Sequence, residues 1–94
     1  MSKVWFITGC STGFGRNLAT EALKNGYCVA VTSRNTDDVK DIAAAYPDTA
    51  IAIELDVTKP AQVTAAVKEA LDKFKRIDVL VNNAGIGYFG AIEE

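Results

Sequence analysis

The chain has 94 residues, 49% of them hydrophobic and 23% charged, which suits one small globular domain and not two. A formal net charge of −2, with acidic and basic residues interspersed, argues against nucleic-acid and membrane-surface partners, and no apolar run approaches the roughly 20 residues of a membrane span. The two cysteines do not have metal-ligand spacing, and the lack of histidine excludes most zinc chemistry and every His-based catalytic triad. We therefore expect a reduced, cytoplasmic domain without a metal site.

The first predicted strand covers residues 3–8 and contains the apolar run at residues 4–7. The glycine-rich turn Thr-Gly-Cys-Ser-Thr-Gly-Phe-Gly occupies residues 8–15. A strand, a tight glycine turn and a helix in this order lay a pyrophosphate against the helix N-terminus. Gly9 permits the sharp exit from the strand, Gly13 removes a Cβ where the backbone must approach a phosphate, and Gly15 lets the helix lie close to the sheet. The predicted phosphate donors are the backbone amides of Ser11, Thr12, Gly13 and Phe14. The alternative, an ordinary loop, is disfavoured by the strand before the turn and the helix after it.

The helix after this turn is predicted over residues 12–25, with Gly26 as the residue that ends it. The apolar stripe of this helix consists of Phe14, Leu18, Ala22 and Leu23. The second strand covers residues 28–32 and is apolar almost throughout, as expected for a strand covered on both faces. Asn35 or Thr36 then caps a second helix. The core-facing residues of that helix are Val39, Ile42, Ala43 and Tyr46.

The third strand is marked by apolar residues at positions 51, 53 and 55, and it leads to a third helix with Thr58 as its predicted N-cap and Pro60 in its first turn. The apolar stripe of the third helix consists of Val63, Val67, Ala70, Leu71 and Phe74. The fourth strand covers residues 77–81. Right-handed crossovers then predict the strand order 3-2-1-4, with the first two helices on one face of the sheet and the third on the other.

The predicted fold class is therefore α/β, a Rossmann-type parallel sheet with a three-layer α/β/α tendency. We expect a single dinucleotide-binding domain over residues 1–94. Its ligand crevice lies at the carboxyl ends of the strands, between the first and the fourth, where the winding direction reverses.

Three motifs at these carboxyl ends resemble those of the short-chain dehydrogenase/reductase family. They are Thr-Gly-x-x-x-Gly-x-Gly at residues 8–15, Leu-Asp-Val at residues 55–57 and Asn-Asn-Ala-Gly at residues 82–85. The resemblance covers essentially the whole chain. It implies an oxidoreductase that interconverts an alcohol and a ketone or aldehyde by hydride transfer with a nicotinamide dinucleotide.

The family's catalytic Ser and its Tyr-x-x-x-Lys pair would lie further along than any residue present, because none of the three tyrosines has a lysine four positions later. No catalytic residue is assigned, and we expect the N-terminal, cofactor-binding half of an oxidoreductase, truncated after the fourth strand and inactive by itself. A fourth strand without its next neighbour leaves an exposed edge, which predicts association into a homo-oligomer. A non-catalytic dinucleotide-binding or redox-sensing module is the alternative function.

The resemblance also implies contacts to the cofactor. Asp56 is expected to accept a hydrogen bond from the adenine amino group, with the backbone of Val57 beside it. The alternative for Asp56 is a carboxylate that satisfies nearby amides in a strand-to-helix turn. Asn82 is expected to have a more structural role. The residues implied along the cofactor are Asn83, Ala84 and Gly85.

The pair Ser33-Arg34 closes the second strand, where an acidic residue would bind the ribose 2′-hydroxyl of NAD and repel a 2′-phosphate. Ser33 is a neutral donor and the Arg34 guanidinium can hold a phosphate with two parallel hydrogen bonds, so the sequence favours NADP(H) over NAD(H). The alternative is that Arg34 is a solvated loop charge. Thr12 stands where some family members have a second basic residue. Arg16 could add positive potential, although a surface position on the helix is the preferred interpretation.

Overall fold

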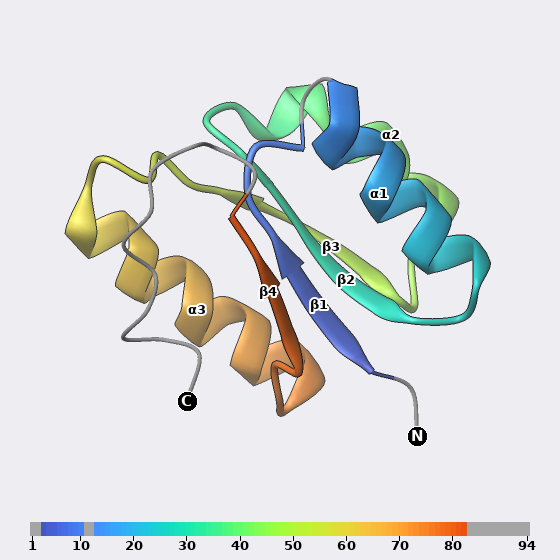
Figure 1. The fold of residues 1–94 in the computed structure, drawn as a ribbon. Helices are drawn as coiled ribbons and strands as arrows, with labels where there is room; N and C mark the ends of the chain where they lie inside the picture. The colour runs from blue at the N-terminus through green and yellow to red at the C-terminus, as the bar shows by residue number, and fades with distance from the viewer. Residues whose placement is uncertain (1–2, 11–12, 83–94) are drawn as a thin grey trace.

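The computed structural model describes residues 3–10 and 13–82 of the chain. Strands and helices alternate as predicted from the apolar pattern (Figure 1). In chain order they are β1 (Val4–Ile7), α1 (Gly13–Lys24), β2 (Cys28–Ser33), the short 3₁₀ helix η1 (Thr36–Asp38), α2 (Lys40–Ala45), β3 (Ala50–Glu54), α3 (Pro60–Phe74) and β4 (Val79–Val81).

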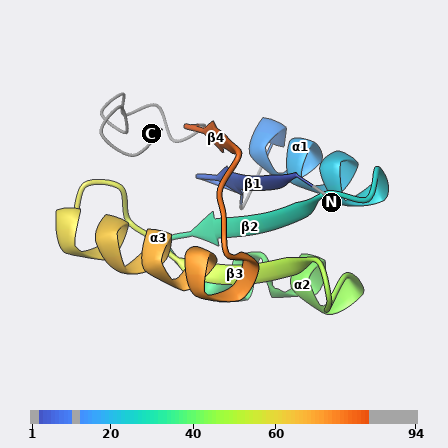
Figure 2. The same cartoon turned by 90° about the horizontal axis from the view of Figure 1, so that it is seen from below.

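The four strands form one parallel sheet in the order β3-β2-β1-β4, so the predicted fold class is confirmed. Figure 2 shows this order from bottom to top. Both neighbours of β1 are in parallel register with it: Phe6 pairs with Ala30 of β2 on one side and with Leu80 of β4 on the other. The order reverses between β1 and β4, and the crossover from β3 to β4 runs through α3.

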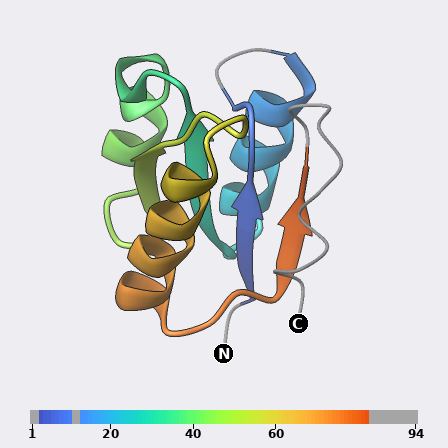
Figure 3. The same ribbon diagram turned by 90° about the vertical axis from the view of Figure 1, so that its left-hand side faces the viewer.

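The helices cover opposite faces of the sheet, with α3 in front of the strands and α1 and α2 behind them (Figure 3). Two cores follow from the alternation of side chains along each strand. On the side of α1 and α2, Ile7, Val29 and Val31 are buried. On the side of α3, Phe6 and Ala30 pack against Val63 and the alanines of that helix.

Two apolar residues predicted in helix stripes are in fact exposed. Phe14 is 66% exposed and Leu71 is 40% exposed. The buried face of α1 is made by Gly15, Ala19, Ala22 and Leu23, and Phe14 lies about 100° around the helix from Gly15. In α3 the buried residues are Val63, Ala66 and Ala70, and Leu71 is offset from Ala70 by the same angle. Small residues face the sheet in both helices, so the helices approach it closely and the larger apolar side chains remain at the flank.

The starts of the later helices also differ from the prediction. Thr58 is not the N-cap of α3: that position belongs to Lys59, which makes no side-chain capping bond, and Pro60 follows it. Thr58 instead donates both its amide and its hydroxyl to Asp56. The predicted second helix is divided into η1, which Asn35 caps by accepting from the Asp37 amide at 3.0 Å, and α2.

Candidate functional site

The glycine turn after β1 is tied to the strands on both sides. The Thr8 amide donates to the Val81 carbonyl at 3.0 Å, and the Cys10 amide donates to the Thr32 carbonyl at 2.8 Å. Between them Gly9 has φ of 65°, a left-handed conformation in which a side chain is strained. The backbone therefore leaves β1 sharply at Gly9, as the sequence predicts.

The start of α1 has two properties that suit an anion and a third that lets the helix pack closely on the sheet. Gly13 has φ of 58°, and a Cβ added there would meet no heavy atom of the described residues within 4 Å. The first turn of α1 contains no acidic residue that would offset the positive end of the helix dipole. Gly15 is buried, which allows α1 to lie close to the sheet. Ser11 and Thr12, two of the predicted amide donors, lie outside the described residues.

Cys10 lies within this turn, and its thiol is unreactive. Its Sγ donates to the Ile7 carbonyl at 3.3 Å, and burial raises the pKa of its thiol to about 11. A thiol with this pKa is neutral at physiological pH and a poor nucleophile. Cys10 is therefore a small buried residue that fills the space under the turn.

Ser33 and Arg34 end β2 in different environments. Ser33 is only 4% exposed: its carbonyl accepts from the Leu55 amide at 2.8 Å and its Oγ accepts from the Asn35 amide at 3.3 Å. Arg34 is exposed. Its guanidinium makes no hydrogen bond or ion pair with any residue that the structure describes, so it is available to an external anion.

Asp56 follows β3 and makes the local contacts of a turn residue. Its Oδ1 accepts from the Thr58 amide at 3.0 Å and from the Thr58 hydroxyl at 2.6 Å, and its own amide donates to Gln62 Oε1 at 2.8 Å. These contacts hold the pKa of the Asp56 carboxyl below its usual value, chiefly through the Thr58 hydroxyl and then its amide, with Lys59 and Arg34 contributing through their charge. Asp56 therefore does make the contacts of the alternative interpretation, in which its carboxylate satisfies an amide in the strand-to-helix turn. Its other oxygen, Oδ2, accepts no hydrogen bond in the described part of the chain.

The fourth strand ends beside the same turn. Thr8 Oγ1 donates to Asn82 Oδ1 at 3.3 Å, so Asn82 ties the ends of β1 and β4 together as its expected structural role requires. Val57, predicted beside the adenine, is a buried residue of the α3-side core. The other three residues predicted along the cofactor, Asn83, Ala84 and Gly85, lie outside the described residues.

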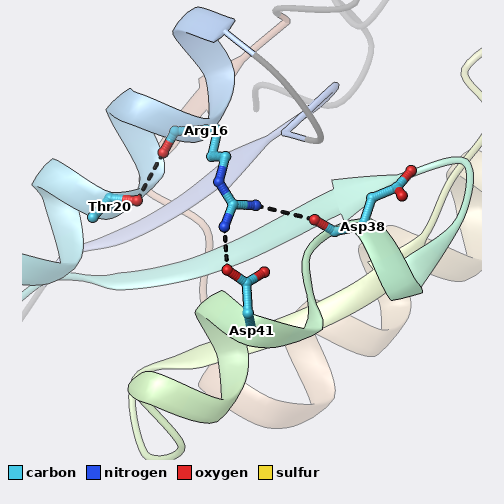
Figure 4. A network of polar contacts seen from close by, with 4 residues as sticks. All are labelled: Arg16, Thr20, Asp38 and Asp41. Carbon is cyan, nitrogen blue, oxygen red and sulfur yellow. Dashed lines mark hydrogen bonds and ion pairs between the residues drawn. The ribbon is translucent and has the colours of Figure 1, made fainter.

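Arg16 and Gln62 are two site residues whose contacts the sequence did not reveal. Arg16 donates from Nη1 to the Asp38 carbonyl at 3.0 Å and from Nη2 to the Asp41 carboxylate, which joins α1 to the start of α2 (Figure 4). Arg16 and Asp41 are 25 residues apart in sequence, and Gln62 accepts from the Asp56 amide across the turn between β3 and α3. No local spacing rule predicts such pairs.

The carboxyl ends of three adjacent strands thus bring the predicted site residues that the structure describes to the same end of the sheet. The Cys10–Thr32 and Ser33–Leu55 backbone bonds join the glycine turn to Arg34 and, beyond it, to Asp56. Within residues 3–10 and 13–82, no group of three or more His, Cys, Asp or Glu side chains could hold a metal ion. No helix in that same part of the chain is long and apolar enough to span a membrane.

Comparisons with known proteins agree with this arrangement. The family profile described as short chain dehydrogenase matches residues 3–94. Oxidoreductase BOA17 of Botryotinia fuckeliana is 41% identical over 95 residues, which cover 100% of this chain and 35% of that protein. The 11-beta-hydroxysteroid dehydrogenase A of Sesamum indicum is 34% identical over 96 residues and is covered over 28% of its length. The chain therefore spans about a third of the length of the curated relatives it matches.

Solved structures show the same likeness. A short-chain dehydrogenase from Streptomyces avermitilis superposes with a TM-score of 0.83 and 46% identity, over 88% of this chain and 31% of its own. A 3-ketoacyl-(acyl-carrier-protein) reductase from Brucella melitensis, complexed with NADH, has a TM-score of 0.83 and 43% identity over 92% of this chain and 36% of its own.

Proposed function

Because this chain belongs to the short-chain dehydrogenase family, a family of oxidoreductases, we propose that it is the dinucleotide-binding part of an NADP(H)-dependent enzyme that interconverts an alcohol and a ketone or aldehyde. One observation carries the proposal: the chain leaves β1 through a left-handed glycine turn, and α1 then begins at the end of the sheet where the strand order reverses between β1 and β4. The bound nicotinamide supplies hydride transfer. This part of the protein supplies binding and orientation, as one domain over residues 1–94.

The residues present fit a dinucleotide. The open space at Gly13 and the absence of an acidic residue in the first turn of α1 suit a pyrophosphate held by backbone amides. Asp56, at the end of β3, has one carboxylate oxygen engaged by Thr58 and can accept from the adenine amino group with the other. We also assign Asn83, Ala84 and Gly85 to the cofactor on the family motif alone.

The preference for NADP(H) rests on Arg34. Its guanidinium lies just after β2, is exposed, and has no hydrogen bond or ion pair with any described residue. Neither position 33 nor position 34 carries a carboxylate that could accept a hydrogen bond from the ribose 2′-hydroxyl of NAD. Two charge-assisted bonds to a 2′-phosphate contribute about 1.5–3 kcal/mol each, less the cost of desolvating an exposed guanidinium. A preference of roughly ten- to a hundredfold follows.

Calorimetric titration of the chain with NADPH and with NADH tests this proposal. The parent should bind NADPH more tightly, and Arg34→Ala should bring the two dissociation constants within about threefold of each other. Lys24→Ala, which removes an exposed cation from the opposite end of α1, is the matched control and should leave the ratio unchanged. Equal affinities in the parent, or a ratio that survives Arg34→Ala, would show that Arg34 is only a solvated charge.

The enzymatic half of the proposal needs the complete protein. The chain covers about a third of its relatives, so the catalytic groups are assigned to sequence beyond it, and a Tyr-x-x-x-Lys motif there supports the enzyme. An NADPH-coupled assay over several alcohols and ketones measures the activity directly. A complete protein that binds NADPH but lacks this motif and any turnover would be the non-catalytic module instead.

A further inference from the structure

Arg16 links the two helical segments that follow β1 and β2, at the edge of the sheet where the proposed cofactor lies (Figure 4). Its guanidinium makes two contacts with the second segment, one to the Asp38 carbonyl at 3.0 Å and one to the Asp41 carboxylate. The second contact holds the pKa of Asp41 below its usual value, so the pair stays charged at neutral pH. One turn further along α1, the Thr20 hydroxyl donates to the Arg16 carbonyl at 2.9 Å. Arg16 is thus fixed at both its backbone and its side chain.

The segment that Arg16 holds is the one that carries Arg34. Its first end is anchored in the sheet, where the Leu55 amide donates to the Ser33 carbonyl at 2.8 Å. Two local hydrogen bonds stabilise the residues that follow: the Asn35 amide donates to Ser33 Oγ at 3.3 Å, and Asn35 Oδ1 accepts from the Asp37 amide at 3.0 Å. The far end is held by Arg16 through Asp38 and Asp41. Arg34 therefore lies on a short loop whose two ends are fixed, one by β3 and the other by α1.

The two arginines differ in how many guanidinium donors remain available to a phosphate. The Arg16 guanidinium is already engaged by an acceptor from each of two residues, whereas that of Arg34 has no hydrogen-bonded partner within the described residues. We propose that Arg16 is a positioning residue for cofactor selection: it holds residues 34–38 in the arrangement in which Arg34 reaches the 2′-phosphate of NADP(H). This inference rests on the proposed function, since it concerns the same site.

A direct electrostatic role for Arg16 is the rival explanation, and the Asp41 variant separates the two. If Arg16 acted through its charge, Asp41→Ala would remove a neighbouring negative charge and tighten NADPH binding. If Arg16 acts by positioning, Asp41→Ala weakens NADPH binding in the same direction as Arg16→Met, because both changes remove the Arg16–Asp41 contact that holds the loop. The two explanations thus predict opposite signs for one substitution.

The experiment compares Arg16→Met, Asp41→Ala and the double variant, with dissociation constants for NADPH and NADH measured by calorimetry. Each single variant should raise the NADPH constant about fivefold, the upper range for an exposed ion pair, and leave the NADH constant within about twofold. The double variant should be no weaker than Arg16→Met, because Arg16→Met already removes the contact that Asp41→Ala removes. Asp72→Ala, which breaks the exposed Lys68–Asp72 pair on α3, is the matched control and should change neither constant.

Amide hydrogen exchange of residues 36–39 provides a readout that does not depend on any cofactor. Both single variants should exchange faster there than the parent, and Asp72→Ala should not. Unchanged exchange, additive losses in the double variant, or tighter NADPH binding by Asp41→Ala would each overturn the positioning role. A parent without preference for NADPH would instead refute the proposed cofactor, and with it the selective role, even if exchange showed that Arg16 holds the loop.

Discussion

Replacing Gly13 by alanine should separate cofactor binding from folding at the glycine turn. The added Cβ would meet no heavy atom of the described residues within 4 Å, so the fold itself presents no clash. The φ of 58° is left-handed and costs a non-glycine residue about 1–2 kcal/mol, while the loss of glycine's freedom in the unfolded chain returns about 0.4–1 kcal/mol. We expect a net loss of about 1 kcal/mol, which lowers the melting temperature by roughly 4–8 °C in a domain of this size.

The effect on binding should be much larger. The methyl group enters the space assigned to the pyrophosphate, where displacing two charge-assisted amide–phosphate bonds of about 1.5–3 kcal/mol each weakens binding at least a hundredfold. Gly26→Ala is the matched control, because Gly26 also has a positive φ, of 88°, also faces open space, and follows the opposite end of α1. It should cost similar stability and leave binding unchanged.

The assay combines urea denaturation, followed by the fluorescence of Trp5, the one tryptophan of the chain, with calorimetric titration of NADPH. Normal binding by Gly13→Ala would show that the pyrophosphate does not lie on this turn. Equal loss of binding in both variants would show that stability, and not phosphate access, controls the result.

Three further predictions concern stability and association. The Asp78 carboxylate pairs with Arg76 and accepts a hydrogen bond from the Val4 amide at 2.8 Å. The Arg76 contact, and after it the Val4 contact, hold the pKa of the Asp78 carboxyl below its usual value of 3.8, so Asp78→Asn should reduce the free energy of unfolding near pH 7. A carboxyl whose pKa is lowered in the folded state adds its full stability only above its unfolded pKa, so the difference in free energy of unfolding between parent and variant should shrink as pH falls below about 4. Urea denaturation at a series of pH values measures this difference, and a difference that does not change with pH would refute the assignment. Lys75 ends α3 with φ of 73°, so Lys75→Gly should raise the free energy of unfolding by up to about 1 kcal/mol, whereas Glu69→Gly in the same helix should lower it by about 1 kcal/mol. Since β4 lies at the edge of the described sheet, we expect light scattering at micromolar concentration to show dimers or larger species, and a monomer would contradict this expectation.

The strand order and the two faces of the sheet could be predicted from the sequence because they follow from strong, general constraints. Apolar strands alternate with amphipathic helices, and right-handed crossovers leave few topologies for such a pattern. The same reasoning found Gly9 and Gly26, whose positive φ values occur where the chain leaves a strand and a helix. These features depend on backbone geometry, which the residue types encode locally.

What the sequence did not predict depends on which side chain competes for which backbone group. Thr58 looked like an N-cap, but the Asp56 carboxylate takes both its amide and its hydroxyl, so the helix begins after Lys59. Phe14 looked like a core residue because it is large and apolar, yet Gly15 and Ala19 face the sheet and leave Phe14 at the flank. Both outcomes are decided by contacts between elements, which no single-helix pattern contains.

The distribution of carboxylates explains why an anion would choose α1 among the helices that start at this edge. The segment after β2 places Asp37 and Asp38 in the first turn of η1 and Asp41 in the first turn of α2. The segment after β3 places Asp56 before α3, where its carboxylate accepts from the Thr58 amide. The first turn of α1 has no acidic residue of its own, and the one charged side chain it contains, Arg16, is cationic and directs its charge toward Asp41. In the proposed complex, the positive end of the α1 dipole would therefore be free to bind the pyrophosphate, while the contact with Asp41 would hold the Arg16 guanidinium away and Arg34 would bind the 2′-phosphate.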